Sequence, residues 1–395
     1  MFIKKLLFCL IVLYSTFNSA QNKIELSPLS KVSLLTIGPQ EELSSKFGHS
    51  AFRIQDPTLG IDVTYNYGMF NFSDPYFYFK FTTGKLPYKI GRHSFENFMY
   101  TYKVENKWVK EQHLALNLKE KNDLIAFLEN NLLPENKYYK YDFLFDNCAT
   151  KIPEVLNKVT QNNLLYNYPH LKNKKTFRDL IHEFLVENEW STFGIDLALG
   201  SVIDKEATPW EHQFSPIYVY HQLEHTTKKD GTPLVSKTAM ILKSKPEEKS
   251  NLFILSPLFW LGLILLATTV ITIKDYTSKK RTKWLDVVLF SATGLAGILI
   301  LFLWLGTDHT ATAWNFNFLW AFPINLYFAF LVRKNKLPET IKLYLIILLS
   351  LILVTMFLWV AEIQVFSPIL IFILLSLIIR YLYILFYLRH SHIKS

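Results

Sequence analysis

Two patterns of hydrophobic and polar residues divide the chain. Before residue 252, apolar residues occur in short runs broken by charged and polar ones, a pattern typical of a water-soluble domain. Three of these runs, at 32–37, 50–54 and 61–67, have the length and residue types of β-strands. A turn-forming sequence, Asp-Pro-Thr-Leu-Gly, joins the last two and predicts a hairpin.

The rest of the soluble part predicts both strands and helices. Asn117 and Glu120 form a capping-box sequence that predicts a helix to about residue 132. A second helix is expected to begin near Cys148, capped by the Asp146 carboxylate. We therefore expect an α+β fold with an antiparallel sheet. Further strands are predicted near 85–90, near 107–116 and at 138–145.

Apolar residues dominate the remainder, 252–395, and predict a C-terminal bundle of about five transmembrane helices. Each apolar stretch is near the length that a bilayer requires. The third is the weakest, because Pro323 and Asn325 interrupt it. The stretches lie at about 252–273, 285–306, 316–332, 343–361 and 366–388.

Basic residues predict the orientation of this bundle. Lys and Arg follow the first, third and fifth spans, whereas the loops that contain Asp308 and Glu362 have neither. Because basic loops stay in the cytoplasm, we expect the C-terminus there and residues 21–251 outside, with the spans in the inner membrane. Arg380, within the last span, is expected to extend its charge toward the cytoplasmic face.

The first 20 residues have the three-part form of a secretory signal peptide. Lys4 and Lys5 precede a short apolar core, and small residues precede an expected cut after Ala20. Cys9 would leave with this leader. The expected mature protein then has Cys148 as its single cysteine, which excludes an internal disulfide.

The positive net charge of +9 does not indicate a nucleic-acid partner. Residues 21–251 carry 28 basic and 28 acidic side chains, so the predicted soluble domain is neutral. Residues 252–395 carry 12 basic and 5 acidic ones, which lie mainly in loops beside apolar spans. The charge therefore reflects membrane topology.

Cys148 is the candidate nucleophile of the soluble domain. At a helix start, backbone N–H groups and the positive end of the helix favour a thiolate and can stabilise an oxyanion. A thiolate needs an imidazole base and a group that orients the imidazole. We expect His49, at the start of a strand, to be the base and Asp62, across the hairpin, to orient it. Asn66, on the same face of that strand as Asp62, is the reserve orienting group.

Other histidines compete with this assignment. His221 and His225 match the H-x-x-E-H spacing of some zinc peptidases. The acidic residues that follow, Asp230, Glu247 and Glu248, lie in a Lys-rich segment that looks like a linker, so we expect an exposed helix end and no metal. The alternative bases are His93, His113, His170 and His182.

Two further features have more than one explanation. The aromatic run at 75–81 predicts a core strand, with an acyl-chain groove or a membrane-facing edge as alternatives. Asp308 and His309 lie in a loop on the same side as the soluble domain. We expect an ordinary polar loop, and the alternative is that they line the active site.

Three segments together resemble the Lnb-type periplasmic domain family: FGHSAFRI at 47–54, DVTYNYGMFNF at 62–72 and YDFLFDNCAT at 141–150. This family takes its name from lipoprotein N-acylation in Gram-negative envelopes. It is similar to the circularly permuted branch of the NlpC/P60 papain-like superfamily, which includes lecithin:retinol acyltransferase. The resemblance implies a permuted papain-like fold and a Cys–His acyltransferase, with Cys148, His49 and Asp62 as its catalytic residues.

The function implied by the resemblance is acyl transfer at the outer face of the inner membrane. Cys148 would accept an acyl chain from a phospholipid and pass it to the N-terminal amine of a lipoprotein. We expect neither ATP nor another cofactor, because a thioester retains the energy of the ester. Two alternatives remain: a cysteine peptidase or amidase acting on peptidoglycan, and a non-catalytic envelope scaffold or sensor. The membrane spans favour lipid substrates.

Overall fold

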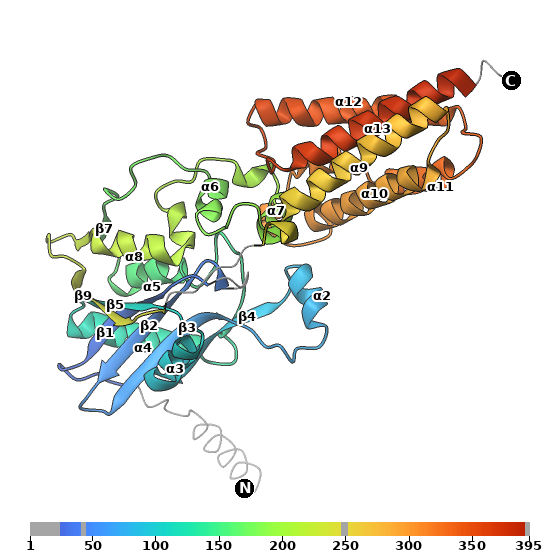
Figure 1. Cartoon of the computed structure of the whole chain (residues 1–395). Coiled ribbons are helices and arrows are strands. Elements are labelled where there is room, and N and C mark those ends of the chain that lie inside the picture. The colour runs from blue at the N-terminus through green and yellow to red at the C-terminus, as the bar shows by residue number, and fades with distance from the viewer. Residues whose placement is uncertain (1–23, 41–44, 246–251, 392–395) are drawn as a thin grey trace, which may run out of the picture.

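The structure is a computed structural model that describes residues 24–40, 45–245 and 252–391. An α+β part formed by the N-terminal half is joined at one end to a bundle of long helices formed by the C-terminal half (Figure 1). This confirms the expected fold class. The predicted leader, 1–20, lies outside the described residues.

A seven-stranded antiparallel sheet forms the centre of the α+β part. Its strand order is β6-β4-β3-β2-β1-β5-β9. The predicted hairpin is confirmed as β2 and β3, with Gln55 opposite Asp62 and Phe52 opposite Tyr65. The strands are β1 Lys31–Ile37, β2 His49–Asp56, β3 Ile61–Met69, β4 Pro87–Ser94, β5 Val109–Leu114, β6 Tyr138–Lys140 and β9 Val235–Leu242.

The edges of the sheet differ from the expectation. Strand β6 ends after three residues, because the Asp142 side chain accepts hydrogen bonds from the Leu144 and Phe145 N–H groups and turns the chain. The opposite edge is β9, which the sequence did not predict. It pairs with β5, the strand that continues the sheet beyond β1.

Helices cover both faces of the sheet. Helices α4, α5 and α8 pack on one face, where Leu34, Phe52 and Tyr65 are buried. On the other face, Phe98 of α3 packs near Leu35. The predicted capping box is confirmed at the start of α4. These helices are α3 Phe95–Val104, α4 Leu118–Asn131, α5 Lys151–Val159 and α8 Pro216–Glu224.

The aromatic run at 75–81 is not a core strand. It forms most of a short helix, α2 (Phe77–Thr82), none of whose residues is buried. Tyr76, which precedes it, has a left-handed backbone. The strand prediction was wrong because aromatic residues favour strands only when a sheet buries one of their faces, and this segment lies beyond the sheet (Figure 1).

Smaller elements connect the sheet to the membrane half. They surround a second core in which Phe177, Leu180 and Phe214 are buried. The elements are β7 Leu164–Tyr166, α6 Phe177–His182, α7 Trp190–Ala198, η2 Ser201–Ile203, η3 Glu211–Phe214 and β8 Thr226–Lys228.

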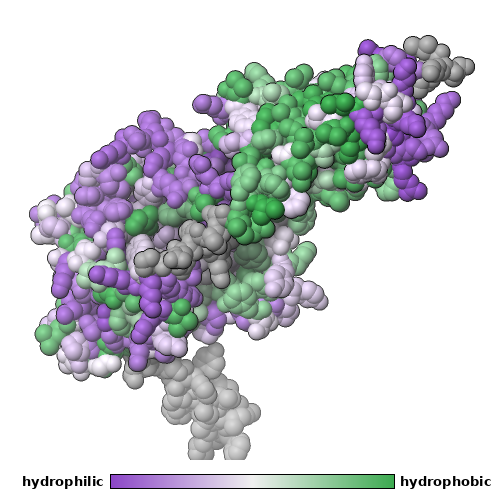
Figure 2. All heavy atoms as spheres, viewed as in Figure 1, coloured by the Kyte–Doolittle hydropathy of each residue, from purple (hydrophilic) through white to green (hydrophobic). Residues whose placement is uncertain are grey.

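Among the described residues 252–391, four helices are long and apolar enough to cross a membrane. Hydrophobic residues cover the outside of this bundle, and hydrophilic ones gather at its far end (Figure 2). The helices are α9 Pro257–Ser278, α10 Lys283–Leu305, α12 Thr340–Val360 and α13 Leu370–Ser391.

The third expected span, 316–332, is not a continuous helix. A short 3-10 helix, η6 (Phe316–Phe318), is followed by turns and then by the eight-residue α11 (Asn325–Val332). Pro323 has no N–H to donate to a preceding turn. Asn325 is buried, and its side chain donates to the Thr293 hydroxyl in α10. The segment therefore packs against α10 as a short helix preceded by irregular backbone.

The Arg380 charge was expected to be exposed at the cytoplasmic face, but it is paired and buried near the α9–α10 loop. It is fully buried and forms ion pairs with Asp275 at 2.9 Å and with Asp286. Arg281 pairs with the same Asp286 at 2.6 Å. Two arginines thus meet two aspartates between α9, α10 and α13. Pairing inside the bundle satisfies each charge without exposing it, which the sequence pattern of one span alone does not reveal.

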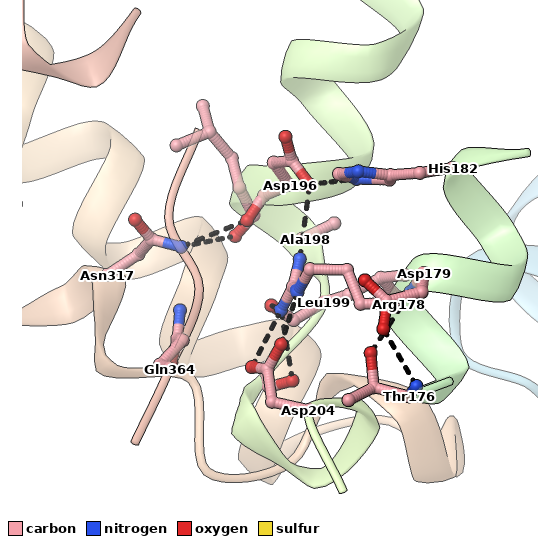
Figure 3. A network of polar contacts seen from close by, with 12 residues as sticks. Thr176, Arg178, Asp179, His182, Asp196, Ala198, Leu199, Asp204, Asn317 and Gln364 are labelled. Atoms are coloured by element: carbon pink, nitrogen blue, oxygen red, sulfur yellow. Dashed lines mark hydrogen bonds and ion pairs between the residues drawn. The ribbon is translucent and has the colours of Figure 1, made fainter. Parts of the chain in front are cut away.

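The two halves are joined by a network of polar contacts (Figure 3). Arg178 of α6 is 2% exposed and binds Asp196 of α7 and Asp204 after η2. The Asp196 backbone carbonyl accepts a hydrogen bond from the Asn317 side chain of the membrane half. Asn315 donates to the next two carbonyls, Leu197 and Ala198.

The same interface continues through backbone contacts. The Gly200 N–H donates to the Ala311 carbonyl at 2.9 Å, and the Ser201 N–H donates to the Trp314 carbonyl at 3.0 Å. A Cβ at Gly200 would lie 1.9 Å from the Ala313 carbonyl oxygen, so only glycine allows this approach. The α6–η2 segment of the soluble half is therefore fixed against the loop after α10.

Candidate functional site

Cys148 lies in the turn that opens α5, as expected, but Asp146 does not cap this helix. The Asn147 side-chain oxygen accepts hydrogen bonds from the Ala149 and Thr150 N–H groups, at 2.7 and 3.0 Å. This is the geometry of an N-cap residue. It orders the turn at 148–150 that leads into α5 (Lys151–Val159), whose own flanking residue, Thr150, makes no side-chain cap bond. Asp146 instead forms an ion pair with Lys151 at 2.8 Å.

Asn147 also fixes the position of the cysteine through its amide nitrogen. This nitrogen donates to the Phe143 carbonyl at 2.6 Å and to the Phe214 carbonyl at 2.8 Å. The side chain is buried, so each of these polar groups depends on its partner. An aspartate could cap the helix but could not donate to the two carbonyls, which explains why an amide stands before the thiol.

His49 is the first residue of β2, and its position depends on Gly48. Gly48 has φ +77°, and a Cβ there would lie 2.5 Å from the Ile37 carbonyl oxygen. Glycine is required at this entry to the strand. The His49 Nε2–H donates to the Asn66 side-chain oxygen. The other ring nitrogen, Nδ1, is then left for Cys148, which is a hydrogen-bonding partner of the imidazole.

The structure does not bring Asp62 to His49. The hairpin register places Asp62 opposite Gln55, six residues along β2 from His49, which corresponds to about 20 Å of extended strand. Its carboxylate accepts two hydrogen bonds from Arg53, at 2.8 and 2.7 Å. Asn66, the reserve in the sequence analysis, is therefore the residue that contacts the imidazole.

The electrostatics of the site favour a thiolate beside an imidazolium. Burial raises the pKa of the Cys148 thiol, but the charge of His49 and its hydrogen bond, with further hydrogen bonds from backbone N–H groups, bring the pKa below its usual value. Burial lowers the pKa of His49, and Lys107 nearby does the same. The charge of Cys148 and the hydrogen bonds that the imidazolium donates to Cys148 and Asn66 outweigh both, so this pKa is raised.

Two backbone N–H groups face the sulfur, those of Ser50 and of Cys148 itself. The next two N–H groups of the helix start, at Ala149 and Thr150, are occupied by the Asn147 side chain. The N–H groups at the helix start were expected to be able to stabilise an oxyanion. The geometry limits that role to the donors that face the sulfur.

Gly68 and a tyrosine complete the surroundings and were missed in the sequence analysis. Gly68 lies in an irregularity of β3 with φ +87°, and a Cβ there would be 3.6 Å from the Cys148 Cβ and 3.9 Å from the His49 Cε1. Tyr141 also lies beside Gly68, since a Cβ at Gly68 would be 4.0 Å from the Tyr141 ring. Its ring stacks on Tyr88 with centroids 4.3 Å apart. A glycine within the motif N-Y-G was the available signal for a bulge.

The competing histidines have other contacts. His113 bonds the Ser33 hydroxyl at 3.0 Å, and His182 bonds Asp196 at 2.8 Å. His170 stacks on His225 of the H-x-x-E-H sequence, with ring centroids 5.5 Å apart. Within the part of the chain that the structure describes, no group of three or more His, Cys, Asp or Glu side chains is arranged to hold a metal.

The fold and this site define a membrane-anchored α+β domain with a cysteine–histidine pair. Residues 16–183 match the Lnb N-terminal periplasmic domain, and residues 247–391 match the Lnb transmembrane domain. The chain is therefore an Lnb-type protein: a multi-pass membrane protein with a periplasmic N-terminal domain. The family resemblance seen in the sequence is confirmed. No curated protein and no solved structure matches the chain, so the permuted papain-like relationship stays a prediction.

Proposed function

We propose that this protein is a lipoprotein N-acyltransferase of the inner membrane, with Cys148 as its acyl carrier. The single observation that carries the proposal is the Cys148–His49 pair, polarised toward thiolate and imidazolium, in an Lnb-type domain fixed to a membrane bundle. Helical spans suit the inner membrane. The acceptor, a lipoprotein in the envelope, is inferred from the match to the Lnb family.

In the first half-reaction, the Cys148 thiolate attacks the carbonyl carbon of a phospholipid ester. The tetrahedral oxyanion receives hydrogen bonds from the N–H groups that face the sulfur, those of Ser50 and Cys148. The carbon–oxygen ester bond breaks, and His49 gives its proton to the departing alcohol. The products are a lysophospholipid and an acyl thioester on Cys148.

In the second half-reaction, the α-amine of a lipoprotein N-terminal cysteine attacks the thioester carbonyl. His49 accepts a proton from the amine, the carbon–sulfur bond breaks, and the thiolate is restored. The product is an amide. Thioester-to-amide transfer is downhill, so neither half-reaction requires ATP. Asn66 keeps the imidazole oriented through both steps by accepting the Nε2–H.

The test is complementation of cells that lack their own apolipoprotein N-acyltransferase. Mass spectrometry of lipoprotein N-termini should show a third acyl chain when this protein is expressed and none with Cys148→Ala. If lipoproteins stay diacylated while muropeptide cross-links or stem peptides change, the protein is a peptidoglycan hydrolase instead. If neither the lipoproteins nor the muropeptides change, the hypothesis of a non-catalytic scaffold or sensor replaces both enzymatic hypotheses.

A further inference from the structure

The most exposed aromatic cluster outside the transmembrane helices surrounds α2. Tyr76, Tyr78, Phe79 and Phe81 are exposed by 80%, 82%, 65% and 50%. Phe72, just before them, is also exposed. Large apolar side chains gathered on one surface mark a contact with another apolar phase.

Helix α2 is held at the level where the bundle begins. The Asp308 N–H donates to the Thr83 carbonyl at 2.9 Å. The His309 ring contacts the Phe81 and Thr82 carbonyls at 3.2 and 3.1 Å. Asp308 and His309 follow α10, a membrane span that ends at Leu305, so α2 lies beside the outer end of that span (Figure 1).

Other exposed apolar residues lie at the same level. The segment Leu252, Phe253, Ile254 and Leu255 precedes α9 and is exposed throughout. The Trp190 indole N–H donates to the Leu255 carbonyl at 2.8 Å. Aromatic rings with a polar edge are typical of the membrane–water interface. Exposed apolar residues thus lie beside the outer ends of two spans, around α2 next to α10 and at 252–255 before α9.

A row of aromatic rings connects α2 to the thiol. Phe77 of α2 contacts Phe70, with ring centroids 5.7 Å apart, and Phe70 contacts Tyr88 at 5.4 Å. Tyr88 stacks on Tyr141 at 4.3 Å. Tyr141 reaches Gly68, which lies directly against Cys148. The row therefore begins at the exposed helix and ends at the nucleophile.

We infer that α2 and the aromatic residues before it insert into the outer leaflet of the bilayer, and that the row of rings guides a phospholipid acyl ester from the leaflet to Cys148. The occupant of the exposed surface is thus the lipid bilayer itself. The membrane contact stands on the position of α2 alone. The guiding role rests on the proposed acyltransferase function.

The membrane contact is tested with the full chain in phosphatidylethanolamine–phosphatidylglycerol vesicles that contain doxyl-labelled lipid. In a Cys9→Ala/Cys148→Ala background, an environment-sensitive fluorophore is attached at Tyr78→Cys. The matched control is Tyr100→Cys on α3, an aromatic position 68% exposed on the sheet side away from the bundle (Figure 1). Quenching at 78 but not at 100 is expected. Equal quenching at both, or none at 78, overturns the contact.

The guiding role is tested with the paired variant Phe70→Ala/Phe77→Ala, which removes two rings of the row, and the control Tyr100→Ala, with Cys148 intact. Phospholipid-derived acylation of Cys148 should fall about tenfold or more in the pair, because the acyl chain loses apolar contact along the row. Alkylation of Cys148 by iodoacetamide should not change. Unchanged acylation overturns the guiding role. Absence of acylation in the parent protein contradicts the proposed function instead and leaves the fluorophore result to decide the membrane contact.

Discussion

At the scale of single residues, the reactivity of Cys148 depends on where one proton resides. Transfer of the proton from the thiol to His49 creates two charges in a buried site, which costs desolvation. Their attraction, together with the hydrogen bond that His49 donates to Asn66 and the one that the thiolate accepts from the Ser50 N–H, offsets that cost. The lowered pKa of Cys148 and the raised pKa of His49 both favour this ion pair. Protonation of the thiolate at low pH, or loss of the imidazolium proton at high pH, removes it.

The first prediction concerns the pH dependence of Cys148 alkylation by iodoacetamide. In the parent protein the rate should titrate with a midpoint below 9.0, the usual pKa of a thiol, because the pKa of Cys148 is lowered by His49. In His49→Ala the midpoint should rise above 9.0, because burial remains while the attraction of the imidazolium is lost. Acyl transfer should fall by about 10²–10⁴-fold.

His113→Ala is the control for this titration, since His113 bonds Ser33 instead of the thiol. Its midpoint should match that of the parent. An unchanged midpoint in His49→Ala would show that the two residues do not form a pair.

The second prediction separates Asn66 from Asp62. Asn66→Ala should reduce acyl transfer by about 10- to 100-fold, because a hydrogen bond to a charged group contributes about 1.5–3 kcal/mol. Asp62→Asn should leave the rate within about threefold of the parent and instead lower the melting temperature, because it weakens the ion pair with Arg53. The opposite ranking of the two rates would restore Asp62 as the orienting group.

The sequence was sufficient to pair Cys148 with His49 but not to choose the third residue. A helix-start cysteine and a strand-start histidine are visible as local patterns. The choice between Asp62 and Asn66 depends on the hairpin register, and both lie on the same face of β3. Arg53, on the neighbouring strand β2, binds the Asp62 carboxylate. This contact can be recognised only when the pairing of the two strands is known.

At the scale of elements, the start of α5 carries out two tasks through Asn147. Its oxygen caps the helix, and its nitrogen ties the turn to the Phe143 and Phe214 carbonyls. Sequence patterns predicted the helix but placed the cap one residue too early. Asp and Asn are both favourable capping residues. Asn147 takes this role because its amide nitrogen also reaches the carbonyls of Phe143 in the preceding turn and of Phe214 in η3.

The third prediction tests these two tasks. Asn147→Asp keeps the cap but places a carboxylate next to the thiol, so the pKa of Cys148 should rise and alkylation at pH 7 should slow by about tenfold per pKa unit. Asn147→Ala removes the cap as well and should lower the unfolding free energy by about 0.5–2 kcal/mol for that loss alone. Thermal unfolding and the alkylation profile measure the two effects separately. If Asn147→Asp and Asn147→Ala had equal effects on thermal unfolding and on the alkylation profile, the side-chain oxygen and nitrogen of Asn147 would not have separate roles.

The membrane elements show a similar limit of sequence patterns. Hydropathy located four spans well, because length and apolar character are properties of each span alone. It did not predict that Arg380 would be neutralised by Asp275 and Asp286 from two other helices. Pairing partners far apart in the sequence are set by packing, which hydropathy does not record.

At the scale of the whole molecule, the fourth prediction concerns topology. Thr232, in an exposed turn of the α+β part, should lie outside the cytoplasm, and Ser278, at the basic end of α9, should lie inside. In a Cys9→Ala/Cys148→Ala background, an impermeant maleimide should label Thr232→Cys in intact spheroplasts. Ser278→Cys should react only after permeabilisation. Labelling of Ser278→Cys in intact spheroplasts would reverse the orientation.

The contacts of Asn315, Asn317 and the Gly200 backbone with their partners across the interface have a consequence for which amines can react. They fix the distance between the Cys148 thiol and the lipid surface. In the proposed reaction, the amine of a lipid-bearing N-terminal cysteine is held at that surface by its own anchor. Lysine amines farther along the same polypeptide lie beyond this reach. Selection of one amine among many then needs no pocket that reads the lipoprotein sequence, which would let a single enzyme serve lipoproteins of unrelated sequence.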